Sequence, residues 1–285
     1  MQDAPPGDRV VATARPDILG VGVDPIDLTT AVERIGAWVD SGTGGYVCAA
    51  NAYTVITCRR EERFRRVVSG ATMVTPDGMP LVWLSRRQGF PSTGRVYGPD
   101  LLLAVCEKSV SRGWRHFFYG GGAGVADLLA RRLAERFPGL AVAGTRSPPF
   151  RPLNVAERAR DIERIRNSGA NIVWVGLGTP KQERWMAEVV DELPAITLIG
   201  VGAAFDFHAG LKPQAPRWMQ RSGLEWLFRL CTEPRRLWRR YLLGNLHFIG
   251  LLLLQSLGMR DFRSPDRPVE DERIRHGERD GEDNL

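Results

Sequence analysis

Cysteine and histidine are scarce in this sequence, and their spacing fits neither a metal site nor a disulfide framework. The 285 residues include four of each. Cys48, Cys58, Cys106 and Cys231 contain no C-x-x-C pair and show no ligand spacing with the histidines. A zinc site and a disulfide-stabilised scaffold are therefore unsupported, and a reducing compartment fits best.

Segments that lead a chain into or across a membrane are missing as well. The N-terminal stretch MQDAPPGDRVVATARPD has acids and prolines where a signal peptide needs a basic start and an apolar run. The apolar run LHFIGLLLLQSL (246–257) has 12 residues, whereas a spanning helix needs about 20. We therefore expect a cytoplasmic protein in which 246–257 forms an interfacial helix.

A D-x-D motif, the usual carboxylate arrangement for holding a nucleotide-bound divalent metal, does not occur before the C-terminal tail. The sequence thus predicts no metal and no other cofactor. If the substrate is a sugar diphosphate, cations of the protein must stabilise its leaving group.

Acidic residues are few in one segment. Residues 212–260 carry nine basic side chains and two acidic ones, which gives this segment a net charge of about +7. Since the net charge of the whole chain is +6, the remainder is slightly negative. The basic character is therefore a property of this segment rather than of the whole chain.

What the sequence does contain is a regular alternation of apolar runs and helical patterns between two polar tails, 1–16 and 259–285. The runs predict strands at 18–23, 46–50, 71–74, 115–120, 140–144, 171–177 and 196–202. The helical patterns cover 28–39, 53–68, 100–111, 125–137, 155–167 and 181–190. Residues 17–214 are thus predicted to form an α/β core, a Rossmann-like and mainly parallel sheet with helices on both faces.

In such sheets ligands bind beyond the carboxyl ends of the strands. Four of these ends carry glycine or an acid where a plain connection needs neither. They read TPDGMP (75–80), GGAGVAD (121–127), GTPKQERW (178–185) and AAFDFHAG (203–210).

The glycine-rich turn at 120–124 leads from a strand into a helix, where backbone N–H groups can cradle a diphosphate. It fails the dinucleotide pattern G-x-G-x-x-G because Val125 occupies the last position. A tight turn with no ligand explains these glycines equally well.

The GTPKQE stretch has a structural interpretation too. Thr179 and Gln182 have the spacing of a capping box, and Pro180 suits the first position of a helix. Taken alone, helix initiation is the better explanation.

Asp77 follows a buried strand and precedes Gly78, so it is either a turn residue or a general base with a raised pKa. Asp206 competes for the role of base, and a purely structural aspartate remains a third possibility. We expect His208 to be a hydrogen-bonded structural residue.

Five motifs in order resemble the WecG/TagA/CpsF family of glycosyltransferases, glycosyltransferase family 26. They are TPDGMPLVW, RVYGPDLL (95–102), VGLGTPKQERW, GVGAAFDFHAG and APRWMQRSGLEWLFRLCTEPRRLWRRYL (215–242), and the resemblance runs from about 18 to 242. It implies inverting, metal-independent transfer of a sugar such as N-acetylmannosamine, its uronic acid or glucose. The donor would be a UDP-sugar and the acceptor a polyprenyl-diphosphate-linked sugar at the cytoplasmic membrane face, for cell-surface polysaccharide synthesis.

The resemblance also implies roles for individual residues. Asp77 matches the family's proposed base, and Asn51 belongs to an Ala-Ala-Asn segment where many members have T-P-N, so that a threonine hydroxyl proposed to assist is absent here. With Asp77 and Asn51 we predict Arg235 and Arg239 as catalytic. The residues predicted to bind substrate are Thr75, Gly78, Arg95, Gly98, Asp100, Gly120, Gly121, Gly178, Pro180, Lys181, Gln182, Glu183, Gly202, Phe205, Asp206, Arg217, Arg229 and Arg236.

Residues 215–258 are predicted to form an amphipathic helical appendage. On a helical wheel Arg235, Arg236, Arg239 and Arg240 lie on one face, at roughly 0° to 140°, and apolar side chains at roughly 200° to 340°. Such a helix suits anionic lipid head groups and can supply arginines to a diphosphate. The alternative is a core-packing helix with solvated arginines.

Two other classes of function are weighed against this prediction. A nicotinamide-dependent oxidoreductase would need the dinucleotide glycine pattern, which is broken. An arginine-rich nucleic-acid-binding module would explain the basic segment but not the strand ends, so we expect no nucleic acid partner. A homo-oligomer remains possible.

Overall fold

The computed structural model describes residues 14–262. Its centre is a six-stranded sheet in the order β4-β3-β8-β7-β5-β6, in which every pair of neighbours is parallel. The strands are β3 (Gly45–Ala50), β4 (Met73–Pro76), β5 (Arg115–Gly120), β6 (Ala141–Arg146), β7 (Ile172–Gly176) and β8 (Thr197–Gly200). The predicted α/β class is therefore confirmed.

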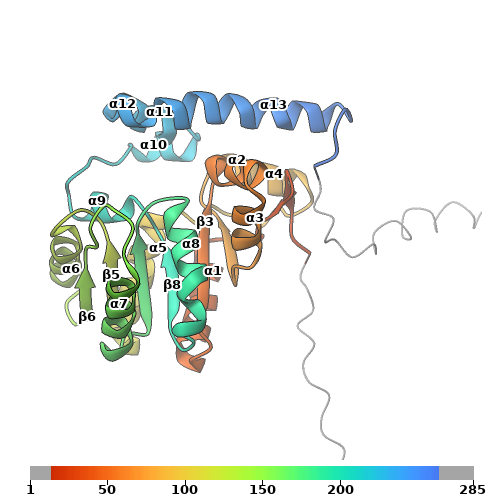
Figure 1. Ribbon diagram of the computed structural model, residues 1–285. Coiled ribbons are helices and arrows are strands. Elements are labelled where there is room, and N and C mark those ends of the chain that lie inside the picture. The colour runs from red at the N-terminus through yellow and green to blue at the C-terminus, as the bar shows by residue number, and fades with distance from the viewer. Residues whose placement is uncertain (1–13, 263–285) are drawn as a thin grey trace, which may run out of the picture.

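Helices cover both faces of the sheet (Figure 1). Alternation along β5 shows why: Phe117 and Tyr119 belong to one buried apolar cluster and Phe118 to the other. Side chains from α2 (Ala52–Arg60), α3 (Glu62–Ser69), α7 (Val155–Asn167) and α8 (Lys181–Val189) complete the first cluster. Those from α1 (Leu28–Ser41), α5 (Gly98–Arg112), α6 (Val125–Arg136) and α9 (Ala204–His208) complete the second.

Local sequence signals account for several boundaries. Asp27 caps α1, since its Oδ1 accepts a hydrogen bond from Thr30 N at 2.8 Å, and the helix ends at Gly42 in the left-handed conformation. Asn154 and Glu157 form a capping box that starts α7. The 3-10 turn η1 (Val190–Glu192) follows α8.

Two predictions of secondary structure were wrong, and one helix was missed. Residues 18–23 form a separate antiparallel hairpin of β1 (Asp17–Ile18) and β2 (Val21–Gly22), turned at Leu19 and Gly20 with positive φ. The predicted helix 53–68 is two helices, because Glu61 is extended. Helix α4 (Met79–Arg87), with proline in its first turn, was not foreseen.

The C-terminal helices lie across the carboxyl-end edge of the sheet (Figure 1). They are α10 (Arg217–Arg221), α11 (Glu225–Thr232), α12 (Pro234–Trp238), the π-helical turn η2 (Arg239–Leu243) and α13 (Gly244–Ser256). Leu237, Tyr241 and Phe248 are buried, so this part of the chain packs on the core through a narrow apolar edge. Among residues 14–262, no helix is both long and apolar enough to cross a membrane.

A few residues of the two predicted tails pack against the folded part of the chain. Arg15 forms an ion pair with Asp24 at 3.1 Å. Phe262 is buried, and the guanidinium of Arg59 lies 4.8 Å from the centre of its ring. The remaining parts of the two predicted tails lie outside the described residues.

Candidate active site

Three connected hollows separate the carboxyl ends of the strands from the C-terminal helices. A central cavity of about 80 Å³ lies between two larger hollows. One, of about 440 Å³, is lined by apolar side chains such as Trp83 and Leu252, and we call it the apolar groove. The other, of about 670 Å³, contains most of the charged side chains, such as Lys181 and Asp206, and we call it the polar cavity. Asp77 lines the central cavity and the groove, Arg240 lines the central and polar cavities, and Arg229 lines all three. The Asp77 carboxylate and two guanidiniums thus meet where the hollows join, and Glu225 also lines the central cavity and the groove.

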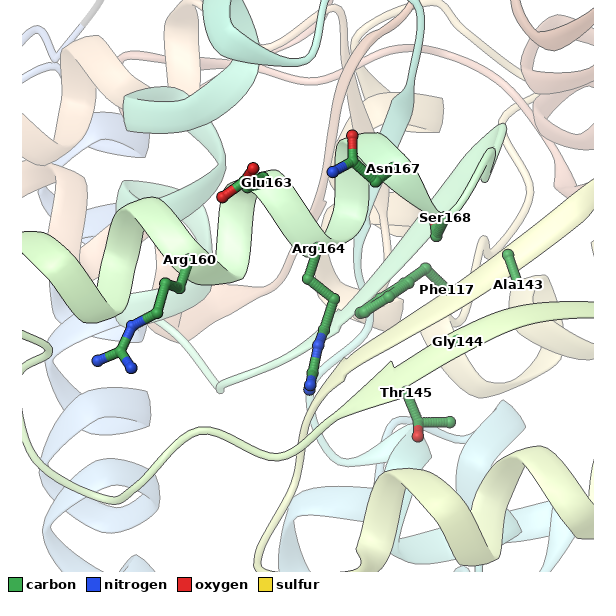
Figure 2. Close-up of a pocket in the computed structure, with 9 residues that line it drawn as sticks. All are labelled: Phe117, Ala143, Gly144, Thr145, Arg160, Glu163, Arg164, Asn167 and Ser168. Carbon is green, nitrogen blue, oxygen red and sulfur yellow. The ribbon is translucent and has the colours of Figure 1, made fainter.

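Another hollow, of about 530 Å³, lies between α7 and the edge strand β6 (Figure 2). Arg160 and Arg164 project from α7, and Phe117 lies behind them. None of the predicted site residues lines this hollow, so it is not the site that the sequence indicates.

Asp77 is held rigidly at the end of β4. Its backbone N donates to Ala50 O at 2.9 Å, which joins it to the end of β3, and its Oδ1 accepts from Gly98 N at 2.9 Å. Burial raises the pKa of the Asp77 carboxyl, while the Arg95 guanidinium acts in the opposite direction. A carboxylate with a raised pKa in a cavity is suited to accept a proton.

Asn51 orients the second oxygen of this carboxyl. As the N-cap of α2, its Oδ1 accepts from Tyr53 N at 3.1 Å and Thr54 N at 3.3 Å. This fixes the amide so that Nδ2 donates toward Asp77 Oδ2 at a long 3.5 Å. Asn51 therefore has a capping role and a place in the site at once.

Arg95 links the core to the C-terminal helices. Its Nε donates to Asp77 O at 2.6 Å, and its Nη2 lies 2.5 Å from Oε2 of Glu225 in α11. The Tyr97 hydroxyl donates to the other oxygen of Glu225 at 2.9 Å. The sequence predicted Arg95 but missed Glu225 and Tyr97, whose partners lie more than a hundred residues away along the chain.

Arg229 and Arg240 are two largely enclosed guanidiniums that form no ion pair among residues 14–262. The Nε atoms of both are buried without a hydrogen-bond partner. Arg240 lies over the ring of Tyr53, at 4.1 Å from its centre, and burial lowers the pKa of its guanidinium. Two such cations beside a cavity suit an anionic ligand, because burying an unpaired charge is costly.

The structure corrects the predicted basic face. Arg240 turns inward, whereas Arg235 and Arg239 are exposed and line none of the three hollows. Arg217 is exposed as well and lines none of them. Arg236 reaches the rim of the polar cavity, where its Nε donates to Glu233 Oε2 at 2.7 Å.

The expected capping box in GTPKQE is wrong. Pro180 occupies the N-cap position of α8 rather than its first helical position, and no side chain caps the helix. Thr179 Oγ1 instead donates to Glu183 Oε1 at 2.8 Å, and Gln182 Oε1 accepts from Gly178 N at 3.1 Å. Gln182 lines the central cavity, while Glu183 lies buried behind it with its pKa raised by burial.

The polar cavity contains several predicted substrate-binding residues. Those that line it are Gly121, Gly178, Lys181, Gly202, Phe205, Asp206, Arg229 and Arg236. The Asp206 carboxylate is 2.8 Å from Lys212 Nζ, which also lies 3.1 Å from Glu233. Since Asp206 is paired and lines neither the central cavity nor the groove, it is a poorer candidate for the base than Asp77.

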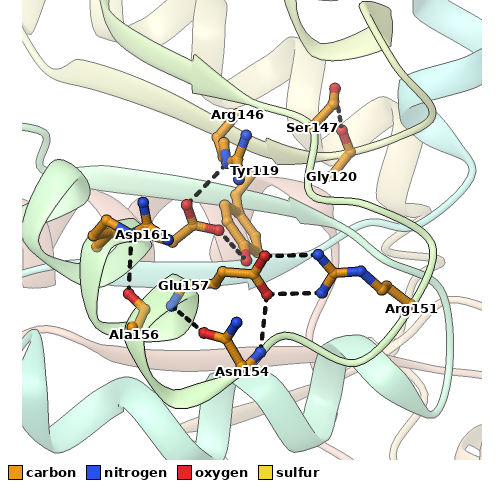
Figure 3. A network of polar contacts seen from close by, with 10 residues as sticks. Tyr119, Gly120, Arg146, Ser147, Arg151, Asn154, Ala156, Glu157 and Asp161 are labelled. Atoms are coloured by element: carbon orange, nitrogen blue, oxygen red, sulfur yellow. Dashed lines mark hydrogen bonds and ion pairs between the residues drawn. The ribbon is translucent and has the colours of Figure 1, made fainter.

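A polar network braces one side of this cavity (Figure 3). The Tyr119 hydroxyl and Arg146 Nε donate to the two oxygens of Asp161, at 3.0 and 2.8 Å. Arg151 pairs with Glu157 through both its terminal nitrogens at 2.7 Å. These contacts fix the segment 147–154, part of which lines the polar cavity.

Other predicted residues lie near the site without lining it. Thr75 is buried in β4, Asp100 lies in the first turn of α5, and a Cβ on Gly120 would approach Gly176 within 2.7 Å. Gly120 therefore permits the close approach of β5 and β7 at this point. His208 Nε2 contacts Pro99 O at 2.9 Å, which fits its expected structural role.

Comparisons with known proteins identify the family. Residues 16–261 match the model of the glycosyl transferase WecG/TagA/CpsF family. An N-acetylglucosaminyldiphosphoundecaprenol N-acetyl-β-D-mannosaminyltransferase of Bacillus spizizenii (strain ATCC 23059 / NRRL B-14472 / W23) is 30% identical over 217 residues, 76% of this chain and 82% of the relative. A Bacillus subtilis (strain 168) enzyme of the same name is 28% identical over 208 residues, 72% and 78% of the two chains. The chain therefore belongs to the WecG/TagA/CpsF family of glycosyltransferases.

Proposed function

We propose that this glycosyltransferase moves a sugar from a UDP-sugar to a polyprenyl-diphosphate-linked N-acetylglucosamine. The two Bacillus relatives support this acceptor by name, and they make N-acetylmannosamine the first donor sugar to test. The product would enter a cell-surface polymer. Family membership sets aside the oxidoreductase and nucleic-acid-binding alternatives.

The observation that carries the proposal is the position of Asp77 at the junction of the groove and the central cavity. In our mechanism the acceptor approaches through the groove and the donor occupies the polar cavity. Asp77 removes the proton of the acceptor hydroxyl while the hydroxyl oxygen attacks the anomeric carbon of the donor sugar. UDP leaves from the opposite side of that carbon. A single displacement of this kind inverts the anomeric configuration.

Arg229 and Arg240 are proposed to stabilise the departing diphosphate. They take the role that the sequence suggested for Arg235 and Arg239, because they line the central and polar cavities. In a site screened from water, fixed cations stabilise developing negative charge strongly. Among residues 14–262, no three His, Cys, Asp or Glu side chains form a group that could hold a metal ion, and we propose that the two guanidiniums carry this task.

The C-terminal helices are proposed to dock on the cytoplasmic surface of a membrane. Leu242, Leu243, Leu246, Ile249, Leu253 and Leu257 are exposed and form what we call the apolar stripe. Arg235 and Arg239 are exposed beside its N-terminal end. An apolar stripe with neighbouring arginines suits an interface that contains anionic lipids.

A panel of UDP-sugars, each with a polyprenyl-diphosphate-N-acetylglucosamine acceptor, tests the function by release of UDP. We expect one UDP-sugar to give release that depends on the acceptor and falls at least 10²-fold in Asp77→Asn. The proposal is wrong if no UDP-sugar supports acceptor-dependent release, and the role of Asp77 is wrong if the variant keeps near-normal turnover.

A further inference from the structure

The apolar groove has two walls from different parts of the chain. Met79, Pro80 and Trp83 of α4 form one wall, and Trp226 of α11 with Leu252 of α13 belongs to the other. The walls meet at Gly223, where a Cβ would lie 2.8 Å from the Trp83 ring and 3.5 Å from Met79 Cβ. The groove therefore exists only because the C-terminal helices are docked on the core.

The lining of the groove is mainly apolar. Indole, methionine, proline, leucine, isoleucine and phenylalanine side chains make up most of its walls, and three of its four charged residues, Asp77, Glu225 and Arg229, also line the central cavity. Arg95 and Glu225 already satisfy each other at 2.5 Å. A hydrocarbon ligand would exclude water from the apolar side chains of these walls.

The two ends of the groove indicate what enters it. Asp77 and Asn51 lie at the inner end, beside the central cavity. At the outer end, Ile249 lines the groove and is also 53% exposed as part of the apolar stripe. The groove is thus continuous with the surface proposed to meet the membrane and with the residue proposed to act on the acceptor.

We propose that this groove binds the isoprenoid chain of the lipid-linked acceptor, next to its diphosphate. The inference rests on the proposed function and makes Trp83 and Leu252 determinants of acceptor specificity. The isoprenoid chain passes from the apolar stripe into the groove. The sugar linked to it through the diphosphate then reaches Asp77. Short water-soluble acceptors lack this contact and bind weakly.

Direct binding tests the groove without catalysis. Farnesyl diphosphate and inorganic pyrophosphate are titrated against the full chain by calorimetry, in the absence of a donor, and the ratio of their affinities reports the contribution of the hydrocarbon. We expect Trp83→Gln and Leu252→Gln each to lower the affinity for farnesyl diphosphate about 10-fold and to leave that for pyrophosphate unchanged, since loss of one well-buried apolar contact is worth a factor of this order.

Two control variants locate the binding surface. Trp218 is also an exposed tryptophan, 64% accessible, but it does not line the groove, so Trp218→Gln should keep the parent affinity. Leu253→Gln alters the apolar stripe outside the groove and should also keep it. The inference is overturned if Leu253→Gln weakens farnesyl diphosphate as much as the groove variants do, or if the groove variants have no effect.

Kinetics separate this inference from the proposed function. With a polyprenyl-linked acceptor in detergent, the groove variants should raise KM about 10-fold with kcat nearly unchanged. With an acceptor that lacks the isoprenoid chain they should change neither KM nor kcat. Acceptor-dependent UDP release without any dependence on chain length would reject the groove and keep the function. Groove-dependent binding of farnesyl diphosphate without release of UDP from any donor would reject the function and keep the groove.

Discussion

Arg240 allows a sharp prediction, because its burial should cost stability and its charge should serve catalysis. Its guanidinium has no carboxylate partner among residues 14–262, and the Arg229 guanidinium further disfavours its charged form. Removing an ion from water costs several kcal/mol even after relaxation. Stacking on Tyr53 returns about 2 kcal/mol at most. The cost exceeds the return, so the unliganded protein should be strained at this residue.

We therefore expect Arg240→Met to be more stable than the parent and less active. Methionine keeps an apolar contact with the Tyr53 ring and removes the charge. A gain of about 1 kcal/mol would raise Tm by about 2–4 °C in a domain of this size. Loss of a charge-assisted contact worth about 1.5–3 kcal/mol should lower kcat/KM by about 10- to 150-fold.

Differential scanning calorimetry with and without UDP measures the change in Tm and the effect of UDP on it, and acceptor-dependent release of UDP measures kcat/KM. The parent should be stabilised by UDP more than Arg240→Met is, because the variant has lost a cation at the diphosphate. Arg235→Met is the matched control, since Arg235 is exposed and lines none of the three hollows. A lower Tm for Arg240→Met together with unchanged kcat/KM would refute the reasoning about this residue.

Four further predictions concern the base, the metal and the membrane. Because burial raises the pKa of Asp77, kcat/KM should rise with pH through a pKa above the ordinary aspartate value of about 3.9, and this limb should vanish in the residual activity of Asp77→Asn. The same raised pKa means that ionising Asp77 costs stability as pH rises, so Asp77→Asn should unfold at a higher temperature than the parent at neutral pH; an equal or lower Tm contradicts this. Activity should survive excess EDTA, and loss of activity with rescue by Mg²⁺ or Mn²⁺ would show a required metal. Replacing Arg235, Arg236 and Arg239 by Gln should weaken binding to anionic liposomes by about 10²-fold at ~1 kcal/mol per cation; parent-like binding would show that these arginines do not meet the membrane.

Much of the fold could be predicted because the signals are local. The run RHFFYG is buried on both faces and forms β5 over the predicted residues, and the pattern of 155–167 coincides with α7. The hairpin at 17–22 was mistaken for a strand of the main sheet because periodicity does not say which sheet a short apolar run joins. The break at Glu61 was missed for a similar reason, since the residues on both sides of it keep a helical pattern.

The structure brings together those predicted site residues that lie at strand ends. Parallel strands bring their carboxyl ends to one edge, so Asp77, Gly178 and Gly202 lie near one another wherever the chain folds as predicted. Gln182 lines the central cavity and Glu183 does not, although they are neighbours. Consecutive residues of a helix point in directions about 100° apart, so Gln182 and Glu183 face different surroundings. Which of them faces a cavity depends on how α8 packs against the sheet.

The sequence by itself determined the class of the sheet, the position of Asp77 at a strand end and the basic, apolar composition of residues 215–258. Only the tertiary structure decided which face of this segment turns inward. A helical wheel gives only the angular position of each side chain, and the outward face has to be chosen by polarity. That choice placed all four arginines on the outside. The packed helix buries the side of Leu237 and Tyr241, and Arg240 lies next to them on the wheel. Because Leu237 and Tyr241 are packed against the core, Arg240 beside them reaches the cavity, whereas Trp238 and Leu242 remain exposed.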